Sequence, residues 1–418
     1  MFNFVRVYSF FLINSGLLVS ILNIPVTLYL VLDFILISIT VGLVFKSVFN
    51  RGIQKTTFII GVLFIYLFFY VALLSEYFDV DTKESIIYTM VLFRFYCLLI
   101  ISNEVLVRNN NVSFKCFDIY LRDLNIYLIV QFVVILIQSY SPSLGTALIP
   151  IVSEKQSSFY VLAEGDTPGS FSNSIELAFF ALSVLIFNLM KRGNKNFYFI
   201  ALAVIIIFMT GSDTALYISI ALIFAFFLRF YHDSNLKVIF CSSLLFIVVF
   251  IFSSNLDSIY GAVVNKVDNM FLSRLGIMFD LFPRWVLLNE NNLILGSMPD
   301  FESIALTFYN FNNTLAIFDQ NNTGTVINDT YWLALIMAFG LPNFLVLVYV
   351  LYVSLKRIMV TVECYNSRFY FFTILMVIFT IGFFNQVLMV RAFVCPLIFG
   401  LMLFSCKEKR EINNVFKS

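Results

Sequence analysis

Apolar runs of about twenty residues, separated by shorter polar breaks, recur along most of this chain of 418 residues. The hydrocarbon core of a bilayer requires roughly 20 apolar residues per helix. Apolar residues make up 61% of the chain and charged residues only 12%, so no water-soluble surface can be built from them. With 52 Phe against 16 Gly and 8 Pro, long apolar helices are favoured over barrel strands, which alternate polar and apolar residues. The sequence therefore predicts an all-α integral membrane protein, a polytopic helical bundle, and excludes a soluble enzyme.

Twelve membrane spans fit this pattern, and we expect them to form a single polytopic domain over residues 1–418. The first run follows Arg6 without a small-residue cleavage site, which favours a retained span over a cleaved signal peptide. The expected spans cover about residues 4–23, 26–46, 57–75, 85–107, 123–140, 171–190, 196–211, 213–229, 237–254, 327–355, 369–390 and 392–406.

The distribution of Lys and Arg indicates the orientation of these spans, because cytoplasmic connections are enriched in both residues. With the N-terminus inside, the inside segments hold 19 of the 26 Lys and Arg residues. The outside segments hold six, and Arg94 lies within a span. The sequence therefore predicts an even number of spans with both termini in the cytoplasm.

Two outside segments, residues 141–170 and 255–326, are longer than a connection requires. Loops of this length are usually functional or disordered. The second is rich in Asn and contains Trp285 and other large apolar residues, so we expect a folded extracytoplasmic cap of short helices. Amides and aromatic rings together suit carbohydrate binding. An AT-rich gene would enrich the chain in Asn, Phe and Ile as well, and it remains an alternative explanation.

Arginine is scarce outside the cytoplasm, and one arginine lies within the membrane. Arg94 is about ten residues into its span, where a guanidinium costs roughly 2.5–3.5 kcal/mol. A structural ion pair with Asp33 and contact with an anionic ligand are equal alternatives. Arg274, Arg284 and Arg391 are the arginines placed outside, and a guanidinium matches the geometry of phosphate oxygens. Ion pairs within the loop would explain either loop arginine alone, but together the four favour binding of a lipid-linked diphosphate.

Three carboxylates near the outer edge of the bundle are candidate general bases: Glu176, Asp213 and Asp329. A carboxylate partly removed from water can accept a proton from a sugar hydroxyl. Acidic residues are also common at helix N-termini, where they complement the helix dipole. This second interpretation suits Asp213, which follows Gly211 and Ser212.

The sequence favours neither a metal site nor a nucleic-acid partner. Asp79-Val80-Asp81 has the spacing that metal-dependent glycosyltransferases use, but neighbouring acids indicate a solvated acidic connection. His232 is the only histidine and falls on the inside, and no Cys/His cluster suggests zinc. A net charge of +1 provides no attraction for nucleic acid. We therefore expect no metal and no other cofactor.

Four features follow one another between residues 169 and about 400. They are Gly169-Ser-Phe-Ser-Asn-Ser-Ile-Glu-Leu-Ala178; Met209-Thr-Gly-Ser-Asp-Thr-Ala-Leu216; Arg274 followed by Arg284, Trp285 and Ile294-Leu-Gly296; and Asn328-Asp-Thr-Tyr-Trp-Leu333 with Gly340-Leu341 after it. In this order they resemble the helix entries, turns and second large loop of the O-antigen polymerase and O-antigen ligase superfamily of bacterial envelope enzymes. Asp213 stands where the family usually has an arginine. The ligase branch is expected to have a histidine where this chain has Asn328-Asp329, which favours the polymerase branch.

The resemblance implies a GT-C-like bundle and a metal-independent, inverting glycosyl transfer on the outer side of the bacterial cytoplasmic (inner) membrane. The donor would be a growing glycan on undecaprenyl diphosphate, and the acceptor a hydroxyl of a lipid-linked repeat unit. A co-polymerase that regulates chain length is an expected partner.

The resemblance also implies roles for the candidate site residues. Asp329 or Glu176 would orient or deprotonate the acceptor. The residues expected to bind the diphosphate are Arg274, Arg284, Arg94 and Arg391.

Two other classes of protein remain alternatives. A secondary transporter or a lipid-linked oligosaccharide flippase would also have about a dozen spans, but it predicts polar groups near the midplane and two related halves. The clear midplane charges here are Arg94 and Asp33, and the long second loop is asymmetric. A non-catalytic membrane scaffold would tolerate loss of all the outside arginines.

Overall fold

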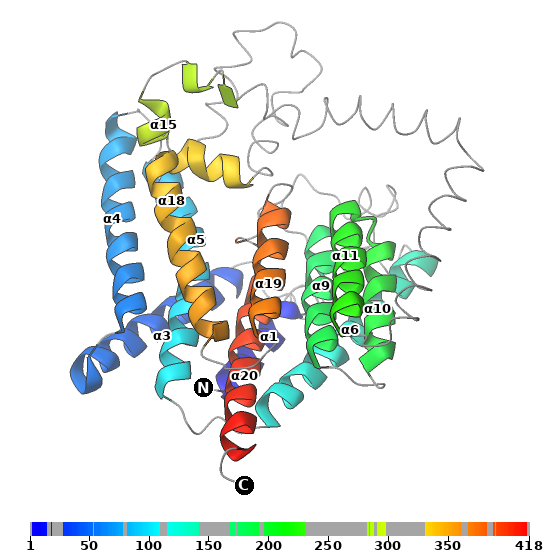
Figure 1. Ribbon diagram of the computed structural model, residues 1–418. Coiled ribbons are helices and arrows are strands. Elements are labelled where there is room, and N and C mark those ends of the chain that lie inside the picture. Colours follow the sequence, from blue (N-terminus) through cyan, green and yellow to red (C-terminus); the bar gives the residue numbers. More distant parts are fainter. Residues whose placement is uncertain are drawn as a thin grey trace, which may run out of the picture. The chain divides into compact units, whose positions relative to one another are not determined.

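The computed structural model describes most of the predicted spans (Figure 1). Its described residues are 2–14, 18, 28–52, 54, 55–77, 82–108, 115–141, 168–171, 174–191, 196–230, 282–283, 285–287, 291–297, 331–360, 367–382, 388 and 390–415. The regular secondary structure of these residues is helical throughout. Among them, six helices contain a stretch long and apolar enough to cross a membrane: Val31–Phe49, Lys55–Tyr77, Ser85–Glu104, Lys115–Tyr140, Ser174–Lys191 and Tyr331–Met359. The chain is therefore a helical membrane protein.

Most predicted spans coincide with a helix. The span predicted at 237–254 and most of the predicted loops 141–170 and 255–326 lie outside the described residues. The helices are α1 (Phe2–Ile13), α3 (Leu28–Arg51), α4 (Lys55–Tyr77), α5 (Thr82–Arg108), α6 (Lys115–Tyr140), α9 (Ser174–Lys191), α10 (Phe197–Met209), α11 (Asp213–Phe230), α15 (Asn292–Leu295), α18 (Tyr331–Val360), α19 (Ser367–Gly382) and α20 (Arg391–Val415).

Several helix ends differ from the predicted spans, because a helix is not limited to its apolar run. α6 begins at Lys115, eight residues before the predicted start, and the charges of its first turns are paired. Asp118 pairs with Lys191 at 2.9 Å, and Asp123 pairs with Arg6 at 2.5 Å. α20 continues past the predicted end at 406 to Val415. α19, in contrast, ends at Gly382, before the predicted end at 390.

The described helices divide between two compact units. The first comprises Met1–Ser219, Phe344–Phe379 and Val387–Ser418, and the second comprises Ile220–Asn343 and Thr380–Gln386. In the first unit α20 packs against α1, α5, α6 and α9, while α9 also contacts α6 and α10. A second layer forms where α5 packs against α3 and α4. These contacts make α5, α9 and α20 the interior of the unit.

Burial follows this arrangement. Phe179, Phe180 and Phe187 on α9 are fully buried, and a Cβ added at Gly400 of α20 would overlap the ring of Phe187. The outer helices instead keep large apolar side chains exposed, as with Phe34 of α3 (72%) and Phe69 of α4 (68%). Such exposure suits a surface that faces lipid tails and not water.

The second unit is organised around a break in α18. Gly340 has φ 79° and ψ 159°, which no helix accommodates, and Pro342 has no N–H to donate to the carbonyl of Ala338. The carbonyls near the break find other donors. The Ser297 N–H donates to the carbonyl of Met337 at 2.7 Å, and Asn343 Nδ2 donates to the carbonyl of Phe339 at 2.8 Å. The break is therefore stabilised from outside the helix as well as from within it.

Candidate functional site

Two arginines from helices far apart in the sequence converge on one carboxylate. Arg391, at the start of α20, donates from Nη2 to Asp33 Oδ2 at 2.8 Å. Arg94 of α5 donates from Nη1 to the same oxygen at 3.1 Å. Asp33 lies in the second turn of α3. We call these three residues the Asp33 cluster.

Burial within the Asp33 cluster is graded. The side chain of Arg94 is 4% exposed, that of Asp33 is 15% exposed and that of Arg391 is 23% exposed. A guanidinium at such depth requires a charged or strongly polar partner, because an isolated ion is costly to remove from water. Of the two alternatives left open for Arg94, the structure shows the ion pair with Asp33. The more exposed Arg391 is the member that is best placed to contact a ligand.

Glu176, the candidate base, belongs to the surroundings of the Asp33 cluster. It lies in the first turn of α9, and its charge interacts with that of Arg391. The rings of Phe179 and Phe393 are 5.9 Å apart and hold the first turns of α9 and α20 together. The structure therefore brings Arg94 and Arg391 together at Asp33, and it places Glu176 on α9, a helix that packs against α20. Arg274, Arg284 and Asp329 lie outside the described residues.

The segment that leads into α9 is held by two glutamines of α6. Gln138 accepts a hydrogen bond from the Gly169 N–H at 2.9 Å and donates to the Gly169 carbonyl at 2.6 Å. Gln131, one heptad earlier, accepts from the Ser170 N–H at 3.0 Å and donates to Ser170 Oγ at 2.6 Å. Both glutamine side chains are buried. We call this arrangement the glutamine clamp; it fixes the backbone just before the helix that bears Glu176.

Gly169 is required by the glutamine clamp for two reasons. Its φ of 63° lies in the left-handed region, which disfavours a residue with a side chain. A Cβ at this position would also stand 2.6 Å from Gln131 Oε1. Phe171, two residues later, is buried against Phe180 with the ring centres 5.7 Å apart. The sequence pattern Gly-x-Phe thus has a physical basis in this structure.

Replacing Gln138 with Ala should destabilise the protein by about 1–3 kcal/mol, because it leaves the buried N–H and carbonyl of Gly169 without their partner. Ile129→Ala is a matched control on the same helix, since Ile129 is 44% exposed on the apolar surface. Equilibrium unfolding in detergent, followed by loss of helical signal, measures both changes. Equal effects of the two substitutions would show that the glutamine clamp contributes nothing specific.

The segment that contains Trp285 and Gly296 contacts the segment that contains Gly340 within the second unit. Trp285 is 1% exposed; its ring N–H donates to Ser297 Oγ, and its carbonyl accepts from Asn292 Nδ2 at 2.8 Å. The turn that ends at Gly296 meets the break in α18 so closely that a Cβ on Gly296 would lie 2.6 Å from the carbonyl oxygen of Ala338. A Cβ added at Gly340 would overlap the carbonyl of Ile294 more severely still.

The sequence feature at Met209–Leu216 contains the short connection between α10 and α11. Gly211 has φ 69°, and the Ser212 carbonyl accepts from the Leu216 N–H at 3.0 Å. Asp213 is the first residue of α11. This position agrees with the interpretation of Asp213 as a helix N-terminal acid that complements the dipole.

Sequence reasoning missed two groups of buried polar residues. The glutamine clamp is one; a spacing of seven places Gln131 and Gln138 on one helix face and could have revealed it. Glu104 is the other. It is 1% exposed and accepts hydrogen bonds from Ser47 and Thr57, each at 2.8 Å. These contacts join the ends of α3, α4 and α5 that are predicted to face the cytoplasm.

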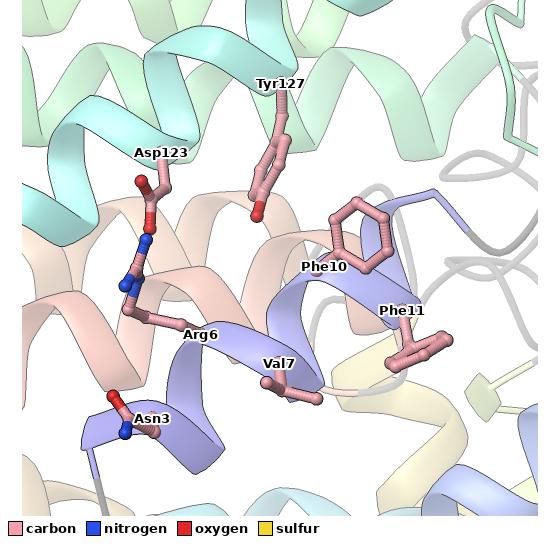
Figure 2. Close-up of a pocket in the computed structure, with 7 residues that line it drawn as sticks. All are labelled: Asn3, Arg6, Val7, Phe10, Phe11, Asp123 and Tyr127. Carbon is pink, nitrogen blue, oxygen red and sulfur yellow. The ribbon is translucent and has the colours of Figure 1, made fainter.

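A groove of about 470 Å³ lies between α1 and α6 (Figure 2). Arg6 and Asp123 form an ion pair at one end of it, and Phe10 and Phe11 lie toward the other. Tyr127 projects into the space between the two helices. The described residues hold no group of three or more His, Cys, Asp or Glu side chains that could bind a metal ion.

Comparisons with known proteins give the chain no assigned relative. No protein-family model matches it. No curated protein and no solved structure matches it either. Function is therefore inferred from the order of the four sequence features and from the geometry of the Asp33 cluster.

Proposed function

We propose that the protein is a surface-polysaccharide polymerase of the O-antigen polymerase type. It transfers a growing glycan from undecaprenyl diphosphate to a lipid-linked repeat unit, by a metal-independent, inverting mechanism. The observation that carries the proposal is the Asp33 cluster, in which guanidinium groups from α5 and α20 meet at one carboxylate, in a unit whose α9 bears the candidate base Glu176 and packs against α20.

The chemistry of this transfer needs cations at the leaving group. As the glycosidic bond to the diphosphate breaks, negative charge develops on the phosphate oxygens, and fixed donors that stabilise this charge usually provide the largest catalytic contribution. A guanidinium can donate two parallel hydrogen bonds to such oxygens. Arg391 has the exposure to do so, while Asp33 holds its side chain and that of Arg94 in place. Arg274 and Arg284 would complete the diphosphate site.

The acceptor sugar requires a base. In this proposal Glu176 or Asp329 orients the acceptor hydroxyl and takes its proton as the new glycosidic bond forms. The carbon of the donor sugar is attacked on the face opposite to the diphosphate, so its configuration inverts. Undecaprenyl diphosphate leaves with the bonding electron pair, and the glycan remains on the acceptor lipid.

The setting of the proposal is the cytoplasmic membrane of a bacterium, with both termini in the cytoplasm and the site on the outer side. Glu176 and Arg391 are placed at predicted outer ends of helices, as the acceptor and donor would require. A co-polymerase that sets chain length is part of the proposal.

The test of the proposal is the length of the surface glycan in cells that carry substituted protein. Arg391→Gln, Arg274→Ala and Arg284→Ala should each lower polymerisation about 10²–10³-fold, the usual cost of one charge-stabilising donor. Gel ladders of the glycan should collapse to single repeat units, with protein abundance unchanged in Arg274→Ala and Arg284→Ala. Arg122→Gln is the matched control. Arg122 is an exposed arginine near the start of α6, which is predicted to face the cytoplasm, whereas the proposed site is on the outer side.

The same cells separate the alternatives. Loss of a polymerase leaves single repeat units on the cell surface, whereas loss of a flippase traps them inside. Ladders of normal length in all three arginine variants would refute the proposal and would suit a scaffold.

A further inference from the structure

The groove between α1 and α6 has a charged end and an apolar end (Figure 2). At the charged end Arg6 Nε donates to Asp123 Oδ2 at 2.5 Å, and the guanidinium also lies over the ring of Phe2, 5.7 Å from its centre. At the apolar end Phe10 and Phe11 are 41% and 38% exposed. This polarity matches a molecule that is itself charged at one end and apolar at the other.

The charged end retains capacity for a ligand. The side chain of Arg6 is 39% exposed, while that of Asp123 is only 10% exposed. Asp123 accepts a hydrogen bond from the Nε of Arg6, and neither Nη atom of Arg6 makes a hydrogen bond to another residue that the structure describes. A guanidinium with two Nη groups accessible can donate to phosphate oxygens.

The surrounding charges favour an anion. Besides the Arg6–Asp123 pair, the first turn of α6 and the last turn of α9, which packs against α6, carry Lys115 and Lys191 against Asp118. The bias of Lys and Arg predicts that these ends face the cytoplasm. The inner surface of a cytoplasmic membrane is rich in anionic lipid, which attracts such clusters of positive charge.

We propose that this groove binds an anionic glycerophospholipid of the cytoplasmic leaflet, with its phosphate on the Nη atoms of Arg6 and an acyl chain along Val7, Phe10 and Phe11. The volume of about 470 Å³ is in the range of ligand-binding pockets and accommodates a headgroup with part of one chain. Tyr127 lies between the two ends, and tyrosine is an amphipathic side chain of the kind enriched at membrane–water interfaces. This site is separate from the Asp33 cluster and does not depend on the proposed polymerase activity.

Lipid retention by the full chain, purified in detergent, tests the proposal. Native mass spectrometry with added phosphatidylglycerol should show a bound lipid on the wild-type protein, and phosphatidylcholine of the same chain length should be retained at least fivefold less. Equal retention of both lipids would identify an unselective apolar groove and overturn the proposal.

Two variants of the ion pair should change retention in opposite directions. Asp123→Asn removes the competing carboxylate, so phosphatidylglycerol retention should rise several-fold. The double variant Arg6→Gln/Asp123→Asn keeps a polar pair without charge, so retention should fall to the phosphatidylcholine level. A protein that merely unfolds cannot give both results, and thermal unfolding of each variant checks its fold.

Arg122→Gln removes a nearby exposed arginine that does not line the groove, and it should leave retention within twofold of the wild type. Loss of retention in Arg122→Gln equal to that in the double variant would overturn the proposal.

Discussion

Replacing Asp33 with Ala should destabilise the protein by about 3–5 kcal/mol, the usual cost of removing one member of a buried ion pair. Arg94 and Arg391 both direct a guanidinium to this carboxylate, at 3.1 and 2.8 Å, and Arg94 is 4% exposed. Loss of Asp33 therefore affects two cations at once. Equilibrium unfolding in mixed micelles should show the midpoint shifted strongly to lower denaturant.

A matched control and a rescue make this prediction specific. Glu76→Ala removes an exposed carboxylate at the end of α4 and should change stability by less than about 0.5 kcal/mol. In the double variant Asp33→Asn/Arg94→Met the buried charge of Arg94 is removed together with its partner, so much of the stability should return. If Asp33→Ala unfolds like Glu76→Ala, the Asp33 cluster does not hold the helices together.

Gly340→Ala should also be strongly destabilising, by about 3 kcal/mol or more. A residue other than glycine at φ 79° and ψ 159° costs roughly 1–3 kcal/mol. The added Cβ also overlaps the carbonyl of Ile294. The backbone at Ile294 cannot move away freely, because three residues later the Ser297 N–H donates a hydrogen bond to the Met337 carbonyl. Overpacking of this kind typically costs a further 1–3 kcal/mol. The same unfolding experiment measures the change.

Gly42→Ala is the control for Gly340→Ala. Gly42 lies inside α3, and a Cβ added there meets nothing within 4 Å. Ala is a better helix former than Gly by up to about 1 kcal/mol, so this substitution should be neutral or slightly stabilising. Opposite signs for the two glycines are the expected result. A Gly340→Ala protein as stable as the wild type would contradict the contact between the turn at Gly296 and the break in α18.

The fold class could be predicted from the sequence, because apolar runs of span length leave an α-helical bundle as the available structure in lipid. The helix ends were less predictable. α6 begins at Lys115 because Asp118 and Asp123 find cations on α9 and α1, and hydropathy alone contains no information about such partners. The number of twelve spans, with its orientation, stays a prediction.

The candidate site was predictable in part. An arginine inside a span indicates that an anionic partner lies nearby, and Asp33 was an evident candidate for that partner. That Arg391 joins the same carboxylate was not evident, because 358 residues separate the two positions and the pairing depends on how α20 packs. The glutamine clamp was missed for a related reason. Gln138 and Gly169 are 31 residues apart, and a predicted loop hides the contact from a search for local patterns.

The bonds that Glu104 accepts from Ser47 and Thr57 have a consequence for the biogenesis of this protein. α3 and α4 precede α5 along the chain, so the hydroxyls of this helical hairpin leave the ribosome before the carboxylate that accepts their hydrogen bonds. The hydrogen bonds between the three helices form only when the last turns of α5, which contain Glu104, have packed against α3 and α4. The hydrogen bonds that tie α3 to α4 through Glu104 can therefore form only after α5 has joined the two earlier helices.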